Sequence, residues 1–141
     1  AFVSMFYFIY DEETHDLTYT QAGHPPALLL RANSDEVTLL KTNGSLVGIF
    51  PGDMVEYEEQ KITLQPGDKV VLYTDAIIET IGHKHPGKEF SLLIDHVLEH
   101  KNTKIDDLLN HIYEFALQCG EAKSYQDDVT LLGLHVLSAD E

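Results

Sequence analysis

Three aspartates lie beside apolar runs in a pattern that could hold a metal ion. Asp75 follows the run 69–74 directly, and Asp127 and Asp128 lie where the run 128–137 begins. If these runs form neighbouring antiparallel strands, the end of one and the start of the other meet at one sheet edge, and the carboxylates converge. Mg²⁺ and Mn²⁺ prefer oxygen ligands, and Mg²⁺ is often held by only one or two carboxylates plus waters. The pattern therefore favours a hard-cation site.

The same residues have a simpler interpretation. Asp is favoured in turns and at helix starts, so Asp75 could cap the short turn "AIIET", and Asp127 and Asp128 could be ordinary turn acids. Spacing alone leaves both interpretations open.

Other chemically active side chains give weaker signals. His24 lies in the rigid bend "AGHPPALLL", where a structural turn role competes with ligation. His83 and His85 alternate in a loop, but no further ligands follow at a suitable spacing. Cys119 lies on a helix face and is interpreted as packing. No local signature of Ser/His/Asp or Cys/His catalysis is present.

Composition excludes several classes of protein. The chain has 141 residues, which suits a single domain, and its 24 acidic and 9 basic side chains give a formal charge of -15. Such a charge argues against nucleic acid or an anionic membrane surface as a partner. The single cysteine rules out an intrachain disulfide and fits a reducing cytoplasm. No apolar run approaches the roughly 20 residues that span a bilayer.

Apolar periodicity predicts an α+β layered domain, residues 1–141, with strands first, then two helices and a final strand. Two hairpins are expected first, then a half-exposed strand and a buried one, and the amphipathic helices should each cover a sheet. Thr103 is a candidate N-cap, and Gly120 a candidate stop, of the second helix. The expected strands are 1–10, 17–22, 26–32, 36–41, 54–64, 69–74 and 128–137, and the expected helices are 88–100 and 103–119.

Four segments together resemble a known family. "QAGHPPALLL", "GSLVGIF", "ITLQPGDKVVLYTDAIIE" and "DDVTLLGLHV", in this order, are similar to the bacterial serine/threonine phosphatases of the protein phosphatase 2C-like superfamily, in the SpoIIE/RsbU branch. The resemblance extends from about residue 2 to residue 137. It implies a β-sandwich of two antiparallel sheets flanked by antiparallel helical pairs, with a binuclear Mg²⁺ or Mn²⁺ site at one edge.

The resemblance also assigns roles to residues. Asp75 matches the aspartate of the family's second metal motif, and Asp127 matches the metal-binding acid before the last strand. Asp128 is its neighbour and a weaker candidate ligand. His24 falls in the family's Ala-Gly-His-Pro-Pro turn near the site edge, and Glu79 matches a recurrent acid with a structural role.

The implied activity is metal-assisted hydrolysis of phosphoserine or phosphothreonine, by in-line attack of water and without a phosphoenzyme. The implied substrate is a phosphorylated protein, typically an anti-sigma-factor antagonist of the STAS type. The implied setting is a cytoplasmic signalling chain with an N-terminal sensor or receiver domain.

Two departures from the family pattern qualify this expectation. The family's first metal motif belongs several dozen residues before the Ala-Gly-His-Pro-Pro turn, but only 21 residues precede Ala22, and none of them fits. The glycine that usually follows the second-motif aspartate is Ala76. We therefore expect a domain incomplete at its N-terminus, a fragment inactive or nearly so alone, and self-association through exposed sheet edges. The alternative is a non-catalytic pseudo-phosphatase module that binds its partner in a partner-switching system.

Overall fold

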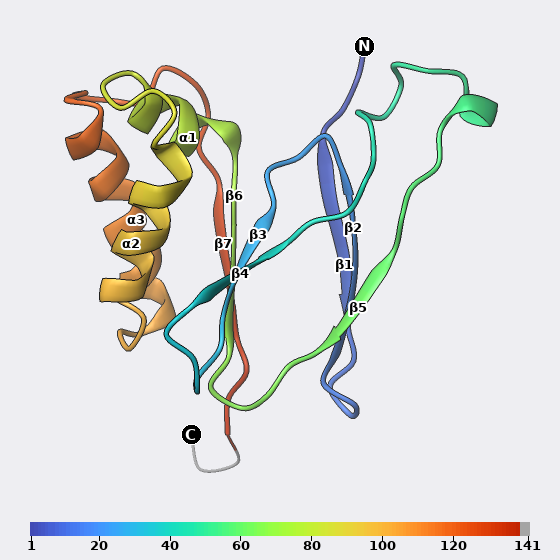
Figure 1. Ribbon diagram of the computed structural model, residues 1–141, viewed down its shortest axis with the longest axis horizontal. Helices are drawn as coiled ribbons and strands as arrows, with labels where there is room; N and C mark the ends of the chain where they lie inside the picture. The colour runs from blue at the N-terminus through green and yellow to red at the C-terminus, as the bar shows by residue number, and fades with distance from the viewer. Residues whose placement is uncertain (139–141) are drawn as a thin grey trace.

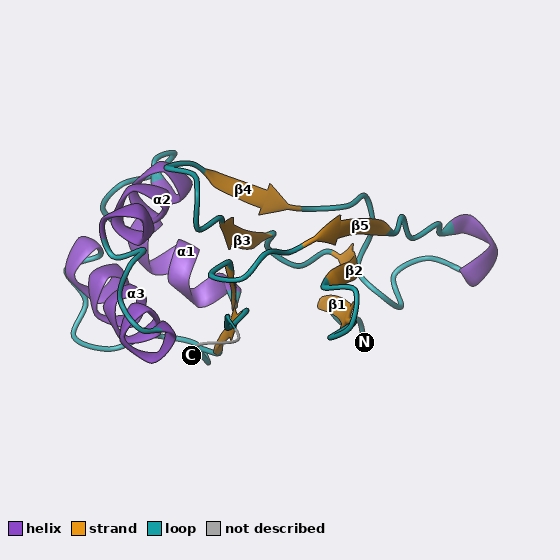
Figure 2. Cartoon of the chain, turned by 90° about the horizontal axis from the view of Figure 1, so that it is seen from below, coloured by secondary structure: helices purple, strands orange, loops and turns teal. Residues whose placement is uncertain are grey.

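A computed structural model describes residues 1–138, which form two antiparallel sheets and three helices. The predicted α+β class is confirmed. All three helices cover one face of the four-stranded sheet, and the three-stranded sheet lies beyond its other face (Figure 1). Figure 2 shows the same order of layers from below. No helix of residues 1–138 is long and apolar enough to cross a membrane.

The three-stranded sheet has the order β1-β2-β5, and the four-stranded sheet has the order β4-β3-β6-β7. The first predicted hairpin is β1 with β2, and the second is β3 with β4. The strands are β1 (Met5–Tyr10), β2 (Asp16–Ala22), β3 (Ala27–Leu30), β4 (Val37–Leu40), β5 (Gln60–Thr63), β6 (Lys69–Tyr73) and β7 (Leu131–His135).

The half-exposed strand predicted over 54–64 is much shorter than expected. Only Gln60–Thr63 pairs, with β2, whereas a short 3-10 helix (Gly52–Met54) lies where that segment begins. Glu58 is held in another way, because its carbonyl accepts a hydrogen bond of 2.7 Å from the Thr20 hydroxyl. Apolar alternation marked the spacing of side chains here, but the backbone groups bond elsewhere: the Gln21 N–H of β2 donates to the Thr42 hydroxyl, and the Glu58 N–H donates to the Asn43 carbonyl.

Three helices lie against the four-stranded sheet. They are α1 (Asp75–Gly82), α2 (Glu89–Glu99) and α3 (Ile105–Cys119). The predicted stop at Gly120 is confirmed, whereas the N-cap of α3 is Lys104 rather than Thr103, whose hydroxyl donates to the His100 carbonyl instead. A Cβ at Gly120 would lie 2.3 Å from the Thr80 carbonyl oxygen, so only glycine lets the end of α3 approach α1 this closely.

Two apolar clusters occupy the two faces of the four-stranded sheet. Alternate side chains of β3 and β6, such as Leu28 and Val71, join the helices in the first cluster. Their neighbours, such as Leu29 and Val70, join Leu17 of β2 in the second cluster, between the sheets. All five residues of β6 are buried, as the unbroken apolar run predicted.

One buried ion pair holds the turn before β6 against the end of β3. Asp68 is 1% exposed, and its carboxylate lies 2.9 Å from the guanidinium of Arg31. The same carboxylate accepts hydrogen bonds from the backbone N–H groups of Ala32 and Gln65 at 2.9 and 2.8 Å. This pairing sets the position at which β6 enters the sheet.

Candidate metal centre

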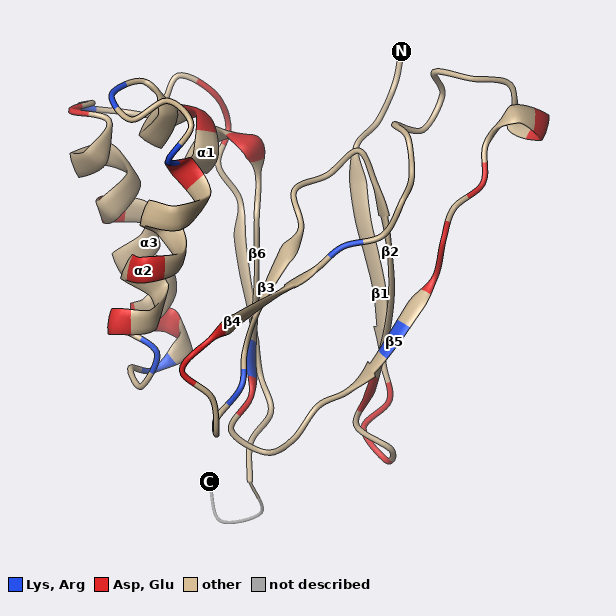
Figure 3. Ribbon diagram, in the orientation of Figure 1, with Lys and Arg blue, Asp and Glu red and all other residues tan. Residues whose placement is uncertain are grey.

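The three candidate aspartates lie at the same edge of the four-stranded sheet. β6 and β7 are antiparallel neighbours, and Tyr73 at the end of β6 is opposite Leu131 at the start of β7. Asp75 therefore leaves the sheet where Asp127 and Asp128 enter it. Figure 3 shows acidic positions at this edge, at the start of α1 and in the chain that leads into β7.

Thr74 joins the two chain segments at this edge. Its backbone N–H donates to the Thr130 carbonyl at 3.2 Å. Its hydroxyl oxygen accepts a hydrogen bond of 3.0 Å from the Thr130 backbone N–H, and the hydroxyl donates to the Asp128 carbonyl at 3.4 Å. The backbones that carry the three aspartates are thus fixed relative to each other by hydrogen bonds.

A cavity of about 130 Å³ opens at this junction. No Lys or Arg is among its lining residues, which are Ser4, His24, Pro25, Thr74, Asp75, Ala76, Asp127 and Asp128. Three carboxylates without a cationic neighbour repel one another, and a bound cation would relieve that repulsion. The ligand roles of Asp75, Asp127 and Asp128 remain a prediction.

The carboxylates differ in their local contacts. Asp75 is exposed, and its carboxylate makes no hydrogen bond or ion pair with any residue that the structure describes, so both carboxylate oxygens are available. Its charge adds to the effect of burial in raising the pKa of Tyr73. Asp127 accepts a 2.8 Å hydrogen bond from the Asp128 backbone N–H, which is a turn contact but leaves lone pairs free.

Asp75 is the first residue of α1, and the N-cap is Thr74. Asp75 is therefore not the cap. It lies in the first helical turn, where the helix dipole favours a carboxylate. Ala76 lies in the same turn and is 4% exposed, without the positive φ that would require glycine. Ala76 lines the cavity.

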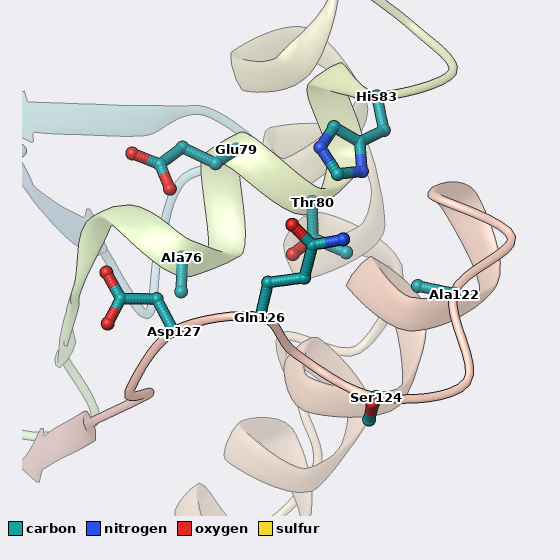
Figure 4. Close-up of a pocket in the computed structure, with 8 residues that line it drawn as sticks. All are labelled: Ala76, Glu79, Thr80, His83, Ala122, Ser124, Gln126 and Asp127. Atoms are coloured by element: carbon teal, nitrogen blue, oxygen red, sulfur yellow. The ribbon is translucent and has the colours of Figure 1, made fainter.

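The other candidate residues lie around this centre or away from it. His24 lines the cavity, and its Nδ1 donates to the Pro25 carbonyl at 2.9 Å, which leaves Nε2 with the lone pair. Glu79, His83 and Asp127 line a smaller adjoining cavity of about 50 Å³, in which Figure 4 shows Asp127 below Ala76 and the first turn of α1. His85 lines neither cavity.

One group of potential ligands escaped prediction. His96, His100 and His111 gather where α2 and α3 pack together. The four-residue spacing of His96 and His100 in a predicted helix was a visible signal that both rings share one face. Nothing in the sequence indicated that His111 of the next helix would join them.

The donor set of the acidic cavity fits a hard divalent cation. Its candidate ligands are carboxylate oxygens, the lining holds no thiol, and a single imidazole lies at the edge. Asp75 and Asp127 would hold the ion. No acid from residues 1–21 lines the cavity, so the bridging carboxylate expected of a binuclear site is not among its lining residues.

Solved structures with the same fold include a phosphatase domain. The Bacillus subtilis SpoIIE phosphatase domain, from a crystal presoaked with Mn, matches with a TM-score of 0.73 and 18% identity over 95% of this chain and 56% of that chain. The RsbU and RsbW domains of a Mycobacterium tuberculosis protein match with a TM-score of 0.78 and 26% identity, over 96% of this chain and 37% of that chain. The fold is thus that of the protein phosphatase 2C-like domains.

The sequence matches narrow this class. Residues 1–137 match the family described as Stage II sporulation protein E (SpoIIE), so the chain belongs to that family, in its RsbU/SpoIIE branch. The phosphoserine phosphatase RsbU of Bacillus subtilis is 27% identical over 135 residues, which are 94% of this chain and 38% of that protein. The chain thus spans well under two thirds of that relative.

Proposed function

We propose that this chain supplies part of the active site of a metal-dependent phosphoserine or phosphothreonine protein phosphatase in a bacterial signalling protein. The proposed substrate is a phosphorylated protein, with a STAS-type anti-sigma-factor antagonist as the favoured class. The proposed cofactor is Mg²⁺ or Mn²⁺, and the proposed compartment is the cytoplasm.

One observation carries the proposal. Asp75, Asp127 and Asp128 line a single cavity at the sheet edge without a cationic side chain among the lining residues. Family membership gives this arrangement its chemical meaning, because RsbU is a phosphoserine phosphatase. The Mn-presoaked SpoIIE crystal supports the choice of cation.

The residues of this chain would divide the work in a simple way. Asp75 offers both carboxylate oxygens, and Asp127 is oriented by the Asp128 N–H, so these two would hold the cation. A bound divalent cation supplies the Lewis acidity for attack of water on phosphorus. Thr74 would hold the edge together through its hydrogen bonds with Thr130. Residues 1–141 alone are expected to bind a cation weakly and to turn over little or no substrate.

The second candidate is a pseudo-phosphatase module that binds a phosphoprotein or kinase-type partner without hydrolysis. Ala76 favours it, since this residue lines the cavity at a position where the family usually has glycine. In that case the cavity would retain its shape but would not activate water.

The test is hydrolysis of p-nitrophenyl phosphate with Mn²⁺ by the longest natural chain that contains these residues. Asp75→Asn and Asp127→Asn should each lower kcat by about a hundredfold or more, because each removes a cation ligand and its charge. Asp107→Asn is the matched control, since this aspartate lies in the first turn of α3 and does not line the cavity. It should leave the rate unchanged.

Two results would contradict the enzyme. One is the lack of Mn²⁺-dependent hydrolysis by the unaltered long chain, and the other is an Asp75→Asn variant as active as the Asp107→Asn control. Tight binding of a phosphoprotein without turnover, alongside the first result, would support the pseudo-phosphatase instead.

A further inference from the structure

A cluster of three histidines lies between α2 and α3, away from the acidic cavity. His96 and His100 are one turn apart on α2, and His111 projects from α3. One ligand nitrogen of each ring lies within 4.8 Å of the others, and none of the three residues is fully buried. None of them lines the cavity that holds Asp75 and Asp127. The two sets of potential ligands are therefore separate.

The rings pack on one another rather than pointing into solvent independently. The His100 and His111 rings stack with centroids 3.9 Å apart, and the His96 and His100 centroids are 4.5 Å apart. The His96 ring also stacks on Phe115 at 4.0 Å. The contact between α2 and α3 thus brings three imidazoles together above its apolar core, in which Leu93, Val97, Leu108 and Ile112 are fully buried.

A hydrogen bond orients the His96 ring. His96 Nε2 lies 3.2 Å from the backbone carbonyl oxygen of His111. Because a carbonyl only accepts, Nε2 carries the proton in this contact, and Nδ1 carries the lone pair. Metal-ligating histidines typically donate their second ring N–H in this way, which fixes both tautomer and ring orientation.

The surrounding charge also suits a cation. The formal charge of the chain is -15, and Glu99 is close enough to His96 to act on its titration. Packing alone does not account for the residue type, since apolar side chains would fill this boundary without the mutual repulsion that three imidazoles have when protonated.

We propose that His96, His100 and His111 form a binding site for a borderline transition-metal ion, with Zn²⁺ as the reference ion, which joins α2 to α3. Three imidazoles with water as the fourth ligand are an established zinc environment in proteins. Because imidazole lone pairs lie in the ring plane, His100 and His111 must turn out of their stacked arrangement before both can bind one ion. Nitrogen ligands separate this site from the oxygen-lined cavity, which favours Mg²⁺ and Mn²⁺.

The test is calorimetric titration of the 141-residue chain with Zn²⁺ in excess Mg²⁺, which occupies carboxylate sites. One Zn²⁺ should bind per chain, and His111→Gln should weaken binding at least about tenfold, since one of three protein ligands is lost. His85→Gln is the matched control, because this histidine lies in a loop outside the cluster, and Asp75→Asn controls for the acidic cavity. Both should bind Zn²⁺ within about twofold of the parent.

Thermal unfolding supplies a second readout that does not depend on enthalpy of binding. Zn²⁺ should raise Tm for the parent and for His85→Gln but not for His111→Gln, because a ligand stabilises only the state that binds it. Far-UV circular dichroism without metal checks that each variant folds. If His111→Gln does not fold, His100→Gln takes its place in the test. Equal Zn²⁺ affinity in the parent and the cluster variant, or loss of binding in Asp75→Asn alone, would overturn the proposal.

Discussion

The two sheets differ in how completely they are covered. The four-stranded sheet packs against helices on one face and against the other sheet on its second face, so every residue of β6 is buried. The three-stranded sheet is covered on one face only. Its strand β1 exposes Met5, Tyr7 and Ile9 by 42, 56 and 58% of their surface.

This difference shows that an apolar run indicates a strand but not its neighbours. Both "MFYFIY" in β1 and "KVVLY" in β6 are nearly unbroken apolar runs, the pattern expected when both faces are buried. Only β6 meets that expectation within this chain. The outer face of β1 is a surface on which another layer or a second copy of the chain could pack.

Substitution of matched isoleucines should separate the two regions most strongly. Ile112 of α3 is fully buried, whereas Ile9 of β1 is mostly exposed. Ile112→Ala should lower the free energy of unfolding by about 2 to 5 kcal/mol, because it leaves a cavity under the helices, and Ile9→Ala by less than about 1 kcal/mol. Urea unfolding measures both values. Equal losses would show that the outer face of β1 is buried in solution.

Ion pairs offer a second contrast between the sheets. Asp68→Asn should cost about 2 to 3 kcal/mol, because it leaves Arg31 without its charged partner and a backbone N–H without a strong acceptor. Lys61→Gln removes the exposed ion pair in which Lys61 Nζ lies 3.8 Å from Asp16 Oδ2. Its loss should cost less than about 0.5 kcal/mol of stability. The same urea series measures both, and a large Lys61 effect would contradict this ranking.

The helical layer should also show a pH dependence that β1 lacks. Burial, and next the neighbouring His100, lower the pKa of His96, with His111 adding to this and Glu99 and the His111 carbonyl opposing it. The unfolded chain thus binds the proton first, so this contribution to stability is complete above a pH of about 6.5 and is lost as the pH falls.

Unfolding of the parent and of His96→Gln, followed from pH 7.5 to 5 with a chelator present, measures this contribution. The parent should lose more stability than His96→Gln over that pH range. The difference between them should be smaller than the effects of Ile112→Ala and Asp68→Asn. Parallel curves for the two proteins would contradict the assignment to His96.

A substitution on the exposed face of β1 should have the smallest effect on stability and the clearest effect on self-association. Ile9→Lys adds a charge to the exposed face and should reduce self-association with little change in stability. Glu12→Gln changes the charge by the same amount in the hairpin turn and serves as the control. Sedimentation velocity at high concentration measures both, and a parent that is monomeric throughout would contradict the expected self-association.

Local sequence signals predicted the fold well where the residues of a single segment determine its secondary structure. The apolar run of β6 and the helical periodicity of α3 gave correct element types, and the position of Asp75 at the strand end followed. Prediction failed where hydrogen bonds to another segment determine the local structure. Val55 and Tyr57 alternate like a strand, but the neighbouring Gln21 and Glu58 N–H groups donate to Thr42 and Asn43 instead of continuing the ladder. The cap at Thr103 was displaced because its hydroxyl donates within the preceding turn.

The candidate site divides in the same way. Two aspartates at strand ends could be paired from topology alone, because adjacent antiparallel strands share an edge. The meeting of His96 with His111 depends on how two helices pack, and the roles of Asp68 in the turn before β6 depend on the end of β3. Such contacts between distant segments leave no local pattern to recognise.

The hydrogen bonds between Thr74 and Thr130 have a consequence for the rate of ion exchange. They fix the backbone on both sides of the cavity before an ion arrives, so binding does not wait for a loop to order. Asp75 and Asp127 are exposed to water. For the proposed cation site, entry of Mg²⁺ should therefore be limited by the loss of its own hydration water, and Mn²⁺, which exchanges water more readily, should equilibrate with the cavity sooner.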